Sequence, residues 1–95
     1  MRQVKEPMPQ YYFHFADGEK EIDKDGVELA DEDAARKQAL KLAAEMLLQM
    51  EAKEFLSHGH WELVVTDQPS GNGRIVMRLF VTATKDDKDA FTLDA

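Results

Sequence analysis

The segment DEDAARKQALKLAAEMLLQMEAKEFL, residues 31–56, predicts a long α-helix at the centre of the chain. Alanine, leucine, methionine, lysine, glutamate and glutamine dominate the segment, and all of them are good helix formers. Asp31 is a suitable N-cap, and Glu32 and Asp33 suit the positive end of the helix dipole. Gly59 can take the left-handed conformation that ends a helix. The helix is therefore expected to fill this segment.

An aromatic segment before the helix predicts a strand. Tyr11-Tyr12-Phe13-His14-Phe15 consists almost wholly of residues that favour β-structure. Side chains alternate between the two faces of a strand, so Tyr12 and His14 should lie on the face opposite to the other three. Asp17-Gly18 is a turn dipeptide that should lead into a short second strand. That strand has two candidate positions, Glu19–Asp23 and Val27–Leu29.

Two further strands are predicted after the helix, at Trp61–Thr66 and Arg74–Thr82. Asp67–Gly73 between them contains one proline and two glycines, which is typical of a hairpin loop. The predicted fold is α+β in the order ββαββ, with one long helix packed on a four-stranded, mainly antiparallel sheet. The side chains expected to face the helix are Tyr11, Phe13, Phe15, Trp61, Leu63, Val65, Ile75, Met77, Leu79 and Val81.

The length of 95 residues indicates one domain. We expect residues 1–10 to form a mobile arm, residues 11–84 the domain, and residues 85–95 a disordered acidic tail. A chain this short buries only about 60–65% of the surface that it exposes when unfolded. The absence of cysteine excludes disulfides and thiolate metal sites. No apolar run is long enough to span a membrane and no secretion signal is present, so a cytoplasmic protein is expected.

The formal net charge of −7 is concentrated in one segment. Residues 16–33 hold nine acids and two lysines, whereas the rest of the chain holds ten acids and ten bases. Such a concentration of negative charge repels phosphate and counts against nucleic-acid binding. The segment is expected to be a solvated turn region, a docking surface for a basic protein partner, or a loose cation site. The acids of this patch are Asp17, Glu19, Glu21, Asp23, Asp25 and Glu28.

The predicted helix and outer sheet face carry more apolar side chains than one helix-on-sheet contact can cover. The polar residues of the helix fill a narrow arc, and apolar residues occupy most of the remaining circle. Large apolar patches on small proteins usually mark an interface, and a twofold dimer is the commonest closed form. The alternative is an ordinary core with scattered exposed apolar residues. The possible interface residues are Tyr12, His14, Leu48, Phe55, Val64, Val76 and Phe80.

No catalytic residue, cofactor or metal site is predicted. His58-Gly59-His60 offers two imidazoles, but no third ligand lies nearby in the sequence. Asp23-Lys24-Asp25-Gly26 has its glycine at the wrong position for a calcium loop. Gly71-Asn72-Gly73 lacks the full glycine pattern of a phosphate loop and precedes a strand. His14 is expected to be an ordinary surface or interface histidine.

Three segments taken together are similar to a known family: residues 8–18 (MPQYYFHFADG), residues 25–31 (DGVELAD) and Ala34-Ala35-Arg36. They resemble a widespread family of short bacterial proteins classed as a domain of unknown function. Its members have Met-Pro, an aromatic strand ending in His, Asp-Gly, Gly-Val-Glu-Leu and a helix with Ala-Ala-Arg. The resemblance covers roughly residues 8–84 and implies a cytoplasmic bacterial protein without assigned activity or catalytic residues. The loop at Asp67–Gly73 is longer than the family pattern.

These observations favour a small non-enzymatic protein-interaction module that acts as a homodimer. A second hypothesis is an antitoxin-like regulator that masks a basic partner through the acidic segment 16–33, by analogy of layout. A third is an enzyme or ligand binder that uses His14 with Tyr12. Nucleic-acid binding is less favoured still, because no basic stripe is present.

Overall fold

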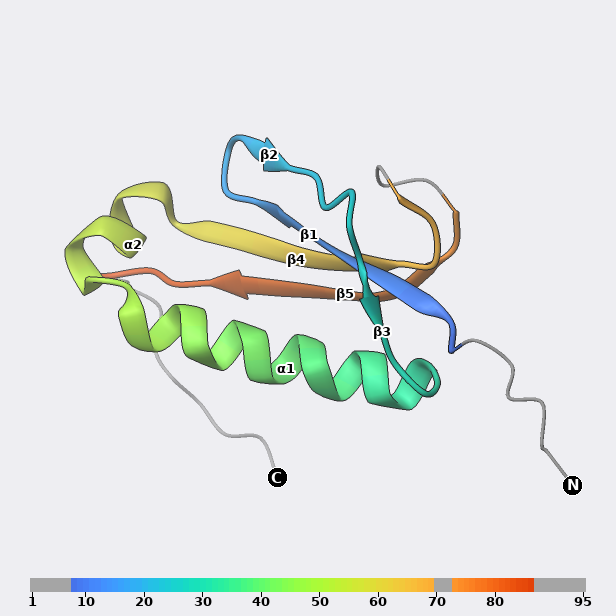
Figure 1. Ribbon diagram of the computed structural model, residues 1–95. Coiled ribbons are helices and arrows are strands. Elements are labelled where there is room, and N and C mark those ends of the chain that lie inside the picture. Colours follow the sequence, from blue (N-terminus) through green and yellow to red (C-terminus); the bar gives the residue numbers. More distant parts are fainter. Residues whose placement is uncertain (1–7, 70–72, 87–95) are drawn as a thin grey trace, which may run out of the picture.

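Strands precede and follow the central helical segment in the computed structural model of the protein, which describes residues 8–69 and 73–86 (Figure 1). The α+β class and the mainly antiparallel sheet are as predicted, although five strands and two helices replace the expected four strands and one long helix. The predicted arm and tail fall mostly outside the described residues, as does part of the Asp67–Gly73 loop. The elements are β1 (Gln10–Ala16), β2 (Lys20–Glu21), β3 (Val27–Glu28), α1 (Glu32–Gln49), α2 (Ala52–His58), β4 (His60–Thr66) and β5 (Ile75–Thr82).

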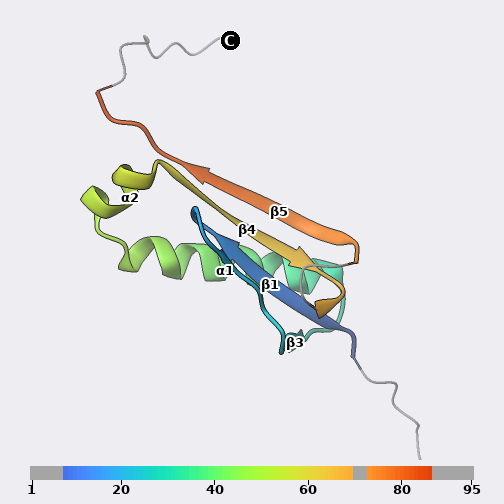
Figure 2. The same ribbon diagram turned by 90° about the horizontal axis from the view of Figure 1, so that it is seen from above.

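The sheet is built around three long antiparallel strands. The strand order is β2-β1-β4-β5, and β3 also pairs with β1. Figure 2 shows β1, β4 and β5 side by side. β2 pairs with the end of β1, where Phe15 faces Glu21, and β3 pairs with its beginning, where Tyr11 faces Val27. Both candidate positions for the second strand are therefore occupied, and the chain between them leaves the sheet. β5 forms the opposite edge and pairs only with β4 among the described residues.

Alanine side chains bring α1 close to the sheet. Ala35, Ala39 and Ala43 follow one another at intervals of four residues and are buried in the core. Small side chains at this contact let the helix backbone approach the strands, because no long side chain separates them. The larger apolar side chains are displaced to the flanks and the outer side of α1, where Leu40 and Leu48 are exposed.

The helical segment begins as predicted but is interrupted once. Asp31 caps α1, because its Oδ1 accepts a hydrogen bond from the N–H of Ala34 at 2.8 Å. Met50 and Glu51 adopt extended backbone conformations and separate α1 from α2. Neither residue is proline or glycine, so no local signal marks the break. The break turns the chain back toward β4, and Phe55 of α2 packs against the core.

The core lies between α1 and one face of the sheet. Trp61, Leu63 and Val65 of β4 are its largest fully buried apolar side chains. Phe15 of β1 pairs with Leu63 in the sheet register and faces the same side, as predicted. The rings of Phe15 and Trp61 have their centroids 5.3 Å apart. The buried Nε1 of Trp61 has no hydrogen-bond partner among the described residues.

The alternation of inward and outward side chains in β5 is interrupted near the beginning of the strand. Val65 pairs with Met77 but Thr66 pairs with Ile75, so Val76 is an extra residue in β5. This β-bulge turns Val76 inward, where it is 6% exposed, and leaves Ile75 44% exposed. The predicted inward Ile75 and outward Val76 are therefore wrong. The remaining inward residues of the strand pack against the core as predicted: Met77, Leu79 and Val81.

Candidate functional site

His14 lies on the sheet face away from α1 and is buried there. The N–H of Asp23 donates to His14 Nδ1 at 3.0 Å, so Nδ1 is the unprotonated nitrogen. Nε2 then carries the hydrogen and donates to Thr66 Oγ1 at 2.9 Å. The Thr66 hydroxyl donates in turn to the carbonyl of Gln68 at 2.7 Å. Both ring nitrogens are thus occupied, and the histidine is covered by its own chain instead of lying at the surface as expected.

Asp23 fills the gap between β2 and β3. Its Oδ2 accepts a hydrogen bond from the N–H of Phe13 at 3.1 Å, and its Oδ1 accepts from Asp25 and Gly26 at 3.0 and 3.1 Å. The Asp23 carboxylate thereby accepts the hydrogen bond that a neighbouring strand would otherwise accept from Phe13 of β1. Burial acts to raise the pKa of Asp23, but these three N–H donors hold it below its ordinary value of 3.8. Burial lowers the pKa of His14 below 6.5, although the charge of Asp23 opposes this change.

Gly26 allows the returning chain to lie directly on Tyr12. Its φ is +74°, and a Cβ at this position would be 2.7 Å from Cε2 of the Tyr12 ring. The Tyr12 hydroxyl donates to Oε1 of Gln10 at 3.0 Å. Tyr12 and His14, the pair considered for catalysis, are therefore both engaged in holding the segment between β2 and β3 against the sheet.

A pocket of about 180 Å³ opens on the same face beside His14. Small-molecule sites usually measure about 300–1,000 Å³, so this pocket suits a single side chain better than a drug-sized ligand. Arg78 and Glu62 form an ion pair at its rim, with Nε and Oε2 3.6 Å apart. The pocket is lined by His14, Phe15, Ala16, Lys20, Ile22, Glu62, Val64, Ile75 and Arg78.

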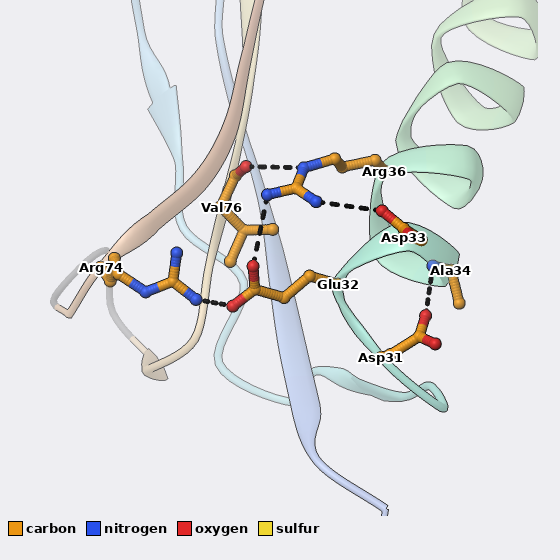
Figure 3. Close-up of polar contacts among 7 residues, drawn as sticks. All are labelled: Asp31, Glu32, Asp33, Ala34, Arg36, Arg74 and Val76. Carbon is orange, nitrogen blue, oxygen red and sulfur yellow. Dashed lines mark hydrogen bonds and ion pairs between the residues drawn. The ribbon is translucent and has the colours of Figure 1, made fainter.

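A charged cluster joins the beginning of α1 to the beginning of β5 (Figure 3). Glu32 lies between two arginines: Oε1 pairs with Arg36 at 3.2 Å, and Oε2 pairs with Arg74. Arg36 also pairs with Asp33 at 3.2 Å and donates from Nε to the carbonyl of Val76 at 3.3 Å. The cluster therefore fixes the helix to the bulged end of the edge strand.

The predicted interface residues do not form one surface. Tyr12, Phe55 and Val64 are half-buried, and Val76 and His14 are buried. Leu48 and Phe80 are 86% and 60% exposed, but Leu48 lies on the side of α1 that faces away from the sheet. Leu40 and Leu47, which sequence reasoning did not single out, are also exposed. The distribution of apolar residues around the helix axis could not identify them, because it does not show which face of the helix turns toward the sheet.

The acidic patch is smaller than its charge implies. Asp23 turns inward and accepts three backbone hydrogen bonds, so it belongs to the structure of the turn. An aspartate two residues before Asp25-Gly26 is a pattern typical of side chain-to-backbone turns, and it could have indicated this role. The remaining acids of the patch are exposed: Asp17, Glu19, Glu21, Asp25 and Glu28.

No group of three metal-ligating side chains occurs within residues 8–69 and 73–86. Over the same residues, neither helix is long and apolar enough to cross a membrane.

Comparison with known proteins gives a family match. The family model for a domain of unknown function, DUF6894, matches residues 10–82, which include every helix and strand described above. No curated protein and no solved structure matches the chain.

Proposed function

We propose that this chain, which belongs to the DUF6894 family over residues 10–82, is a small non-enzymatic protein-interaction module that acts as a homodimer in the bacterial cytoplasm. The exposure of large apolar side chains on a domain this small carries the proposal. Leu40, Leu47 and Phe80 are 54%, 41% and 60% exposed, in addition to Leu48. Exposed large apolar side chains on a small domain are expected where a partner covers them.

Two parts of the surface support two kinds of contact. The flank of α1 with Leu40 and Leu47 suits burial against a second copy of the chain, because both side chains lie on one side of the helix. The pocket on the outer sheet face has apolar walls from Val64 and Ile75 and a charged rim. It suits one apolar side chain of a protein partner.

The hydrogen bonding of His14 supports a non-enzymatic role. A general base needs a nitrogen free to accept a proton from a substrate, and both His14 nitrogens already have partners within the chain. The Tyr12 hydroxyl is also hydrogen-bonded, to Gln10. Both side chains thus take part in hydrogen bonds within the domain.

Size-exclusion chromatography with light scattering at several protein concentrations tests the homodimer. We expect a mass near twice 10.8 kDa for the wild type. Leu40→Gln should shift the dimer toward the monomer, whereas the matched control Lys37→Gln, exposed on the same helix, should not. A wild-type protein that stays monomeric at every concentration would contradict the proposal.

The alternative is the antitoxin-like regulator that masks a basic partner. The exposed carboxylates of Glu19, Glu21 and Glu28 favour it, because they are available to a cationic surface. It requires a short basic protein encoded beside the gene. Co-purification of the two proteins, lost when the three glutamates are changed to glutamine, would support this function. The absence of a neighbouring gene for a short basic protein would contradict the antitoxin-like function.

A further inference from the structure

Among residues 8–69 and 73–86, no strand pairs with the outer edge of β5. The N–H of Ala83 donates to the carbonyl of Gly59, which continues the pairing with β4, so Ala83 directs its backbone groups inward. Backbone groups alternate in direction along a strand. Those of Arg78, Phe80 and Thr82 consequently point outward, away from β4.

Arg36 covers the beginning of this edge. Its Nε donates to the outward carbonyl of Val76, while Glu32 and Asp33 hold the guanidinium in place (Figure 3). The carbonyl of Val76 thus already has a partner within the chain. The part of the edge that remains open is centred on Phe80.

We propose that two copies of the chain join by antiparallel pairing of their β5 edges, with Phe80 opposite the Phe80 of the second copy across a twofold axis. The inference rests on the proposed homodimer and specifies its geometry. The result is one sheet that continues through both copies, with an α1 helix from each on the same face.

This register suits the open backbone groups better than the registers shifted toward Val76. Centring on Phe80 pairs Arg78 with Thr82 of the second copy, so all three outward residues gain partners. Centring on Arg78 would place two arginines opposite each other, and like charges at this position destabilise a strand pair. A register that pairs Arg78 with Phe80 would instead set Thr82 against Val76, whose carbonyl is occupied.

The side chains along the edge agree with the register. Phe80 is exposed, and the Arg78 guanidinium lies 6.0 Å from the centre of its ring. An aromatic pair across the axis stabilises a strand pairing. On α1, Leu40 and Leu47 follow Arg36 by four and eleven residues and share its side of the helix. Since Arg36 reaches β5, this flank is the one that faces the second copy.

Single cysteines test the geometry, because the natural chain has none. Residues in a hydrogen-bonded antiparallel pair have their Cα atoms about 5.5 Å apart, within the range that a disulfide spans. Under oxidation by copper-phenanthroline, Phe80→Cys should form a covalent dimer. Arg78→Cys and Thr82→Cys should each stay monomeric on a denaturing gel, because each lies about 13 Å from its own copy along the strand. Mixed together, these two variants should cross-link to each other.

The mixture leaves Phe80 intact, so it reports the register even where Phe80→Cys weakens the dimer. Lys41→Cys, exposed on α1, is the control for random collision. The edge pairing would be overturned if the wild type is dimeric by light scattering but neither Phe80→Cys alone nor the mixture of Arg78→Cys and Thr82→Cys forms a cross-link. The homodimer itself would still stand. A monomeric wild type would overturn both.

Discussion

At the scale of single residues, His14 decides how the N-terminal half of the chain is held together. It contacts the returning segment through Asp23 and the end of β4 through Thr66. Since Asp23 N–H can only donate, the imidazole must be neutral to accept from it. Protonation of His14 would replace this hydrogen bond with two N–H groups facing each other. The fold therefore depends on one protonation state.

This dependence predicts a loss of stability in mild acid. The pKa of His14 is lowered in the folded chain. Below about pH 6.5, His14 therefore binds a proton in the unfolded chain before it does so in the folded chain. The free energy of unfolding should then fall as pH decreases, until pH passes the pKa of the folded state. Asp23 adds a further loss below its ordinary pKa of 3.8, because its pKa is also lowered on folding.

Urea unfolding, followed by circular dichroism at about pH 7.5 and about pH 5.5, measures the effect of His14. His14→Gln can still accept from Asp23 and donate to Thr66, and it should reduce the difference between the two pH values. The matched control His60→Gln, exposed on β4, should leave the difference unchanged. An equal pH difference in wild type and His14→Gln would show that another group is responsible.

At the scale of elements, the contact of α1 with the sheet rests on small side chains. Ala39 is fully buried, whereas Ala44 on the same helix is exposed. Ala39→Leu should lower the free energy of unfolding by about 1–3 kcal/mol, because the added carbons must separate helix and sheet. Ala44→Leu adds the same atoms toward solvent and should change it little. Thermal unfolding of the two variants makes the comparison, and similar melting temperatures would contradict the close contact.

The sequence predicts the elements best where a local signal marks them. Asp31 at the beginning of α1 and Gly59 at the end of α2, with φ of 84°, are both where turn and cap chemistry places them. The break at Met50 has no such signal, because neither Met50 nor Glu51 is a residue type that ends a helix. The bulge at Val76 likewise depends on how β5 meets β4, which no residue of the strand encodes by itself.

The candidate surfaces are predicted less well, for a similar reason. The exposure of Phe80 follows from the alternation of its strand, whereas the exposure of Leu48 depends on which face of α1 turns inward. Burial of His14 follows from a segment that leaves the sheet and covers it. The arrangement of Arg36 over the β5 edge joins residues forty positions apart and appears only once helix and strand are placed together.

At the scale of the whole molecule, the proposed dimer has a thermodynamic consequence. A protein whose dimer is more stable than its monomer unfolds at a temperature that rises with concentration. We expect the melting temperature of the wild type, measured by calorimetry over a hundredfold dilution, to fall on dilution. Phe80→Glu places a charge opposite its own copy and should remove the concentration dependence, while Lys41→Glu should keep it. A wild-type melting temperature independent of concentration would contradict the expectation.

The buried indole of Trp61 has an optical consequence. It is the single tryptophan of the chain, it is 1% exposed, and its Nε1 has no hydrogen-bond partner among the described residues. An indole in such apolar surroundings fluoresces at short wavelength, and contact with water shifts the emission to the red. The protein thus carries an intrinsic probe near the beginning of β4, which reports the opening of the helix–sheet contact without any label.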